Sequence, residues 1–148
     1  MEGLTKQREG SGLLRILKSR WNLLFVVAFV LGVLALISFG GWHQLAKKYP
    51  HQPPAGTKTF RFVSMGTDRG ASYEFVLTVQ ADPHYIHLST PFFYFPFHPP
   101  LSIPWSAVTE CKWDGSALGI YLSEPKIGLR FGGGELGSYL HDLCVSRR

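Results

Sequence analysis

The sequence predicts a mainly β (α+β) protein, in which an N-terminal transmembrane helix is followed by a bent antiparallel sheet, or partial barrel, with a C-terminal helix. Three observations lead to this expectation. A long uncharged apolar run occupies residues 22–41, apolar residues alternate with a period of two from residue 58 onward, and a stripe at helical spacing ends the chain. A period of two is typical of half-buried strands, and a period of 3.6 is typical of amphipathic helices.

The apolar run has the length and composition of a membrane-spanning helix. Between Trp21 and Trp42 lie 20 residues without a charge, and 13 of them are Leu, Ile, Val or Phe. As a helix, residues 22–42 would be about 31 Å long, close to the roughly 30 Å of a bilayer's hydrocarbon core. We expect Trp21 and Trp42 to be membrane-interface anchors at the two ends. The alternatives are a buried core helix, which normally has a polar stripe, and a cleaved signal peptide, which is normally shorter.

The charges on either side of the run predict its orientation. The basic N-terminal segment, residues 1–21, carries five Lys or Arg side chains, whereas residues 43–57 carry two. Since basic residues are enriched on the cytoplasmic side, we expect a single-pass protein of the cell (inner) membrane with a cytoplasmic N-terminus and an exported C-terminal domain.

The remaining residues are electrically balanced. Residues 58–148 hold eight basic and eight acidic side chains, so the net charge of +5 comes entirely from the first 57 residues. Nucleic-acid binding needs a basic surface on the folded domain, and we therefore expect no nucleic-acid partner.

Composition also divides the chain into segments. Pro50, Pro53 and Pro54 lie close together, and such segments favour stiff, extended conformations. We therefore expect a basic segment (1–21), a transmembrane helix (22–42), a Pro-rich tether (43–57) and one folded domain (58–148).

The alternation in the folded domain predicts half-buried antiparallel strands. In the first two strands, the residues expected to face the core are Phe60, Phe62, Tyr73, Phe75, Leu77 and Val79. Asp114-Gly115 between two such runs is a strong hairpin signal. The segment Glu135–Val145 instead has a helical stripe, formed by Leu136, Tyr139, Leu140 and Leu143. We expect about seven strands and one C-terminal helix in a single domain.

One segment resembles a known family. Residues 98–108, HPPLSIPWSAV, resemble a signature of small uncharacterised bacterial membrane proteins with a pleckstrin-homology-like (PH-like) domain. Those proteins also tend to begin with a membrane helix and a Trp-rich exit similar to residues 41–46. The resemblance covers most of residues 40–131, and Ile103-Pro104-Trp105 is its most specific part. The chain departs from the family in its short C-terminal helix and in Val108, where Ile is common. The resemblance implies a PH-like barrel with a C-terminal helix, and it brings no known activity.

The two cysteines leave two possibilities open. Cys111 and Cys144 are 33 residues apart and lack the spacing of a zinc site. In an exported domain they could form a disulfide between the C-terminal helix and a strand, whereas in a cytoplasmic domain both would be buried thiols.

Motifs that could carry chemistry are weak. Gly132, Gly134 and Gly137 spell GxGxxG, but only 11 residues follow, too few for the second parallel strand of a dinucleotide-binding unit. His84 and His87 are three apart, so a strand would point them to opposite faces. No nucleophile motif or carboxylate pair stands out. We therefore expect no catalytic, cofactor-binding or metal-ligating residues and no cofactor.

The most unusual segment of the domain is aromatic. Five aromatic side chains in six positions exceed what one strand can bury on one face. Either alternate rings turn inward and the rest pack on neighbours, or some rings face lipid or a partner protein. We take the second possibility as the candidate interaction surface, formed by Phe92, Phe93, Tyr94, Phe95 and Phe97.

These patterns predict a non-enzymatic binding or scaffolding module at the membrane. Its expected partners are the lipid bilayer and another membrane protein, and the sequence does not indicate an oligomeric state. The alternatives are a membrane-anchored enzyme with an unrecognised active site and a lipid-headgroup receptor that uses Lys112, Lys126 or Arg130. A cleft with convergent ionisable groups would favour the enzyme, a flat apolar patch the module, and a basic cup at one barrel end the receptor.

Overall fold

The computed structural model describes residues 6–39, 41–56, 58–91 and 97–147, and it describes the side chains of the first helix from residue 20 to residue 36. Contacts divide the chain into two units, residues 1–36 and 37–148. Helix α1, Lys6–Phe39, begins in the first unit. Its large apolar side chains are exposed, with Trp21, Phe25 and Leu36 each more than 70% exposed. Among the residues that were searched, no helix combines the length and apolar character needed to cross a membrane.

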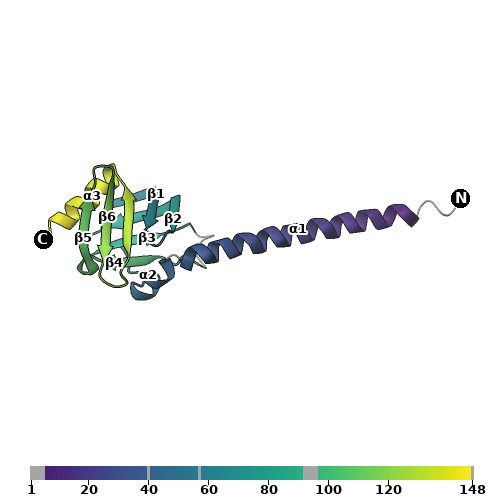
Figure 1. Cartoon of the computed structure of the whole chain (residues 1–148), viewed down its shortest axis with the longest axis horizontal. Coiled ribbons are helices and arrows are strands. Elements are labelled where there is room, and N and C mark those ends of the chain that lie inside the picture. The colour runs from purple at the N-terminus through teal and green to yellow at the C-terminus, as the bar shows by residue number, and fades with distance from the viewer. Residues whose placement is uncertain (1–5, 40, 57, 92–96, 148) are drawn as a thin grey trace. The chain divides into compact units, whose positions relative to one another are not determined.

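The second unit is built on one antiparallel sheet (Figure 1). In the described residues its order is β4-β3-β2-β1-β7-β6-β5. The strands are β1 Lys58–Thr67, β2 Ser72–Ala81, β3 Tyr85–Ser89, β4 Leu101–Pro104, β5 Val108–Trp113, β6 Ala117–Leu122 and β7 Gly128–Gly132.

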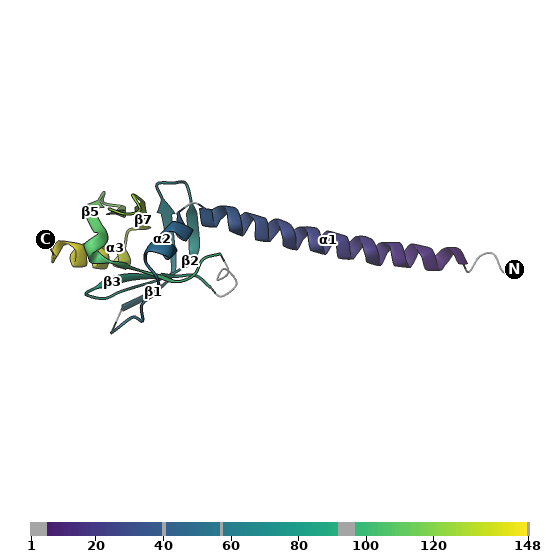
Figure 2. The ribbon, with the colours of Figure 1, turned by 90° about the horizontal axis from the view of Figure 1, so that it is seen from below.

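The connectivity forces this sheet to curl. Strands β4 and β5 are the two edges, yet only the 3₁₀ turn η2, Trp105–Ala107, joins them in the chain. That connection spans at most about 14 Å, whereas the edges of a flat seven-stranded sheet would be about 29 Å apart. The two halves therefore fold toward each other, as Figure 2 shows from the side.

The C-terminal helix α3, Glu135–Val145, packs on the strands of the second half. Leu136 and Leu140 are buried and Tyr139 and Leu143 pack against the core, which confirms the predicted stripe. A Cβ at Gly137 would lie 2.6 Å from the ring of Trp113, so glycine permits the close approach. The nearly closed sheet with its C-terminal helix confirms the mainly β prediction and is consistent with a PH-like layout.

Residues placed by sequence at the membrane exit belong instead to the folded domain. Helix α2, Trp42–Lys48, buries Trp42 to 1% exposure. The Trp42 ring lies 5.3 Å from that of Tyr73, and its Nε1 donates a hydrogen bond to the carbonyl of Pro99 at 2.9 Å. The expectation that Trp42 anchors a helix at a lipid interface is therefore wrong, because the indole is part of the domain core.

The predicted tether also begins as part of the domain. The N–H of Ser102 donates to the carbonyl of Tyr49 at 3.2 Å, and Pro50 forms a bridge with Leu101. The chain here covers the edge of β4, which would otherwise present unpaired backbone groups. Residues 49–52 thus act as an edge cover rather than a spacer.

Two predicted core residues face outward. Phe62 and Phe75 are 76% and 71% exposed and have positive φ angles of 58° and 54°. The pairing of β1 with β2 shifts register between Phe60 and Val63 and again between Val63 and Met65. These irregularities turn both rings to the surface, and the unusual backbone costs on the order of 1–3 kcal/mol at each position.

Candidate functional site

A hollow on the outer face of the sheet is floored by Gly66, Gly119 and Gly128. It lies over parts of β1, β5, β6 and β7 and has a cavity volume of about 360 Å³. Small-ligand sites typically measure about 300–1,000 Å³. Leu118 and Ile120, on either side of Gly119, are fully buried, so alternation along β6 turns Gly119 outward.

Two of these glycines make room for an aromatic ring. A Cβ at Gly119 would lie 3.2 Å from the ring of Tyr121, and a Cβ at Gly128 would lie 3.0 Å from it. Glycine at both positions therefore lets Tyr121 lie across the sheet, with 38% of its surface still exposed. The Nζ atom of Lys112 is 5.3 Å from the ring centroid, within the range of a cation–π interaction.

Strand register arranges the charged groups in two neighbouring rows. In the basic row, Gly119 of β6 pairs with Lys112 of β5 on one side and with Arg130 of β7 on the other. The basic row therefore has an open position between two cations, whose Cα atoms are about 9.5 Å apart across two strand spacings.

The acidic row lies two residues along the strands, about 7 Å away. Here Tyr121 pairs with Glu110 of β5 and with Gly128 of β7. Asp68 completes this row, because its Oδ2 accepts the N–H of Gly128 at 2.8 Å. An aromatic ring thus lies between two carboxylates.

The charged side chains are paired in the structure. Lys112 Nζ lies 3.1 Å from Glu110 Oε2, and Arg130 Nη2 lies 2.6 Å from Asp114 Oδ2. Hydrogen bonds from the backbone N–H groups of Ser116 and Ala117 hold the pKa of Asp114 below its usual range. Exposed pairs of this kind contribute only about 0–1 kcal/mol, so a ligand can replace either partner at small cost.

The hollow unites two of the three cations considered from sequence. Lys112 and Arg130 both line it, whereas Lys126 lines a neighbouring depression. The hollow lies on the face of the sheet rather than at the end of a barrel, and it is not a basic cup. The sequence signal that could have located it is glycine at outward positions of strands, which often marks the close approach of a ligand.

A second polar cluster, formed by Asp82, His87 and Ser102, is buried inside the first half of the sheet. His87 Nδ1 lies 2.8 Å from Ser102 Oγ, and His87 Nε2 lies 3.0 Å from Asp82 Oδ2. The three side chains are at most 5% exposed. The backbone N–H of Gln52, on the edge cover, also donates to Ser102 Oγ at 2.8 Å.

This buried cluster is arranged to hold structure together. Burial opposes the ionisation of Asp82, but hydrogen bonds from His87 and from the backbone N–H groups of His84 and Tyr85 hold its pKa below the usual range. Ser102 is covered by the chain at Gln52, so a substrate has no route to its hydroxyl in this conformation. Sequence reasoning missed the cluster, because its members are far apart in the chain and fit no catalytic motif.

The predicted aromatic surface falls mostly outside the described residues. Residues 92–96 are not described, and Phe97 is half-buried. The expectation for Phe92, Phe93, Tyr94 and Phe95 therefore stays a prediction. Trp21, the other predicted anchor, is exposed on α1.

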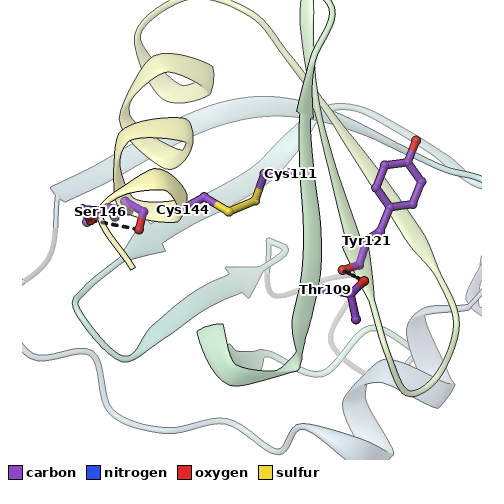
Figure 3. The surroundings of a disulfide bond; sticks show 6 residues. Thr109, Cys111, Tyr121, Cys144 and Ser146 are labelled. Atoms are coloured by element: carbon purple, nitrogen blue, oxygen red, sulfur yellow. Dashed lines mark hydrogen bonds between the residues drawn. A yellow bond between two sulfur atoms is a disulfide. The ribbon is translucent and has the colours of Figure 1, made fainter. Parts of the chain in front are cut away.

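A disulfide joins Cys111 of β5 to Cys144 of α3 (Figure 3). It decides between the two states that the sequence left open, and it makes the predicted link between helix and strand. Tyr121 lies on the other side of the sheet from this bond, where Thr109 Oγ1 donates to its carbonyl at 3.0 Å. The disulfide therefore fixes α3 on the inner side and leaves the hollow open.

Comparisons with known proteins identify no family. No family model matches this chain, and no curated protein matches it. Among solved structures, the chain is similar to part of the complex between the FERM and C-terminal domains of Drosophila Merlin, with 12% sequence identity and a TM-score of 0.41. That similarity covers 61% of this chain and 28% of the Merlin chain.

Proposed function

We propose that this chain is a single-pass membrane protein whose PH-like domain is a non-enzymatic binding module on the exported side. Its partner is another membrane protein or a lipid surface. The observation that carries the proposal is the pairing of an apolar, exposed helix with a compact, electrically balanced β domain in the same chain.

The anchor in this proposal is the uncharged part of α1. Because Trp42 is used in the domain core, the span is shortened to Trp21–Phe39, about 28 Å of helix. This length still suits a hydrocarbon core of about 30 Å. Trp21 then lies at the cytoplasmic interface.

Two independent features support an exported domain. Five basic side chains precede the apolar run, and basic residues favour the cytoplasmic side. The Cys111–Cys144 disulfide is a bond that oxidising compartments maintain and reducing cytosol does not.

A binding role is favoured over catalysis by the contrast between the two polar clusters. The cluster with a serine and a histidine is closed to substrate, whereas the open hollow presents side chains suited to recognition rather than to nucleophilic attack. The lipid-headgroup receptor remains a second candidate, because Lys112 and Arg130 line one hollow.

Two experiments test this proposal. After alkaline carbonate washing of membranes, the intact chain should stay in the pellet, and its release into the supernatant would refute the anchor. A tagged full-length chain, solubilised in detergent, should bring down a specific partner. Phe93→Ser with Phe95→Ser should abolish that capture without unfolding the domain, and unchanged capture would exclude the aromatic segment as the interface.

A further inference from the structure

We propose that the hollow binds a small zwitterion, with an ammonium group over Tyr121 and an oxyanion between Lys112 and Arg130. Phosphoethanolamine, free or as a phospholipid headgroup, has this chemistry. The inference rests on the proposed binding role and names the ligand class of the hollow, but it does not depend on how the chain is anchored.

The basic row is suited to the oxyanion. Lys112 and Arg130 flank Gly119, which has no side chain to fill the position between them. Both side chains are mostly exposed, so they can turn toward a phosphate above Gly119. Charge-assisted hydrogen bonds from a guanidinium and an ammonium are among the strong contacts available to such a group.

The acidic row is suited to the ammonium. The Tyr121 ring already has one cation over it, the Nζ atom of Lys112. Glu110 and Asp68 lie on either side of that ring in the same row. A ligand ammonium can therefore replace Lys112 over the ring, which frees Lys112 to contact the phosphate.

The spacing of the rows selects a zwitterion over a simple ion. Opposite charges about 7 Å apart along the strands match a ligand whose two charged groups are joined by a short carbon linker, with the side chains bending toward it. The lining also balances: Lys112 and Arg130 offset Asp68 and Asp114. A simple anion or a simple cation would be attracted by one row and repelled by the other.

The test is a titration of the isotope-labelled full-length chain in detergent micelles, followed by NMR, with phosphoethanolamine, phosphate or ethanolamine as the probe. Phosphoethanolamine should shift signals from both rows and bind about ten- to a hundredfold more tightly than either fragment, since each fragment loses one charge-assisted contact. No binding of phosphoethanolamine, or equal binding of phosphate, would overturn the proposal.

Variants separate the two rows. Tyr121→Leu should weaken phosphoethanolamine at least tenfold and leave weak phosphate binding unchanged. Lys112→Gln with Arg130→Gln should abolish phosphate binding and leave ethanolamine binding intact. Arg61→Gln, a charge change on β1 outside the hollow, is the matched control and should change none of these affinities. Equal losses of all three probes in both variants would contradict the two-row arrangement.

A filling variant guards against effects on folding. A Cβ at Gly66 would meet no atom within 4 Å, so Gly66→Val should fold normally while reducing the space beside Arg130. Its phosphoethanolamine affinity should fall, and an unchanged affinity would place the ligand elsewhere. Vesicles of phosphatidylethanolamine, compared with phosphatidylglycerol, then distinguish a lipid headgroup from a free metabolite, and the carbonate wash tests the anchor separately.

Discussion

The two polar clusters of the domain use similar side chains for opposite ends. The cluster of Asp82, His87 and Ser102 is buried, and each member contacts another through one hydrogen bond of 3.0 Å or less. The hollow, in contrast, is lined by side chains such as Lys112 and Arg130, which remain more than 60% exposed while paired.

Burial explains the difference. A buried polar group that loses its partner costs about 1–3 kcal/mol, whereas an exposed ion pair contributes about 0–1 kcal/mol. The first cluster is therefore committed to holding β3, β4 and the edge cover together. The second can exchange partners with little loss of stability, which is what a binding site requires. The following predictions test that division, in order of expected effect.

The largest effect should come from the disulfide that holds α3 beside the second half of the sheet. Cys111→Ser with Cys144→Ser opens a loop of 33 residues, and the chain-entropy relation gives a loss of roughly 3–4 kcal/mol. Chemical denaturation of the full-length chain in mild detergent, followed by tryptophan fluorescence, measures it. Reduction of the unaltered protein serves as the control and should cause a similar loss; no loss in either case would show that α3 is held by packing alone.

His87→Ala should destabilise the first half by about 2–4 kcal/mol. The change leaves a cavity and removes the partner of both Asp82 and Ser102. The same denaturation assay applies. His84→Ala is a matched control, because His84 is exposed on the same connection and its change should stay within about 0.5 kcal/mol. Equal effects from the two variants would contradict a structural role for the buried cluster.

Acid should weaken the chain partly through Asp82. Its pKa is lower in the folded chain than in the unfolded chain, so ionisation of Asp82 favours folding. This contribution is complete above the unfolded value of about 3.9 and is lost as the pH falls through the folded value. Asp82→Asn should therefore be less stable at pH 7 and should lose less stability between pH 7 and pH 3. Parallel pH profiles of the two proteins would argue against this assignment.

The smallest effect on stability should come from the hollow. Lys112→Gln with Arg130→Gln breaks two exposed pairs and should change the unfolding free energy by less than about 1 kcal/mol. A loss as large as that of His87→Ala would show that these pairs hold the sheet and would remove the contrast between the two clusters.

Much of the local structure could be predicted because it depends on neighbours in the sequence. The stripe beginning at Leu136 identified α3, and Asp114-Gly115 identified the hairpin between β5 and β6. The inward directions of Phe62 and Phe75 were wrong, because the irregular pairing of β1 with β2 interrupts the alternation. A simple period cannot reveal such an interruption, since it depends on two strands at once.

The candidate site was less predictable than the strands that carry it. Lys112 and Arg130 were named from sequence as separate basic residues, but strand register places Gly119 between them. The role of Trp42 was misassigned for a related reason. An indole at the end of an apolar run suits a lipid interface and a protein core equally well, and only its contacts with Tyr73 and Pro99 distinguish the two.

The sequence by itself determined the apolar helix, the balanced charge of the domain, its strand-rich character and its final helix, because composition and periodicity report the burial of each segment. Only the tertiary structure decided that the two cysteines meet, that Asp82 and Ser102 share His87, and that an acidic row lies beside a basic one. These are contacts between distant residues, and they exist only after the sheet has chosen its register and curled.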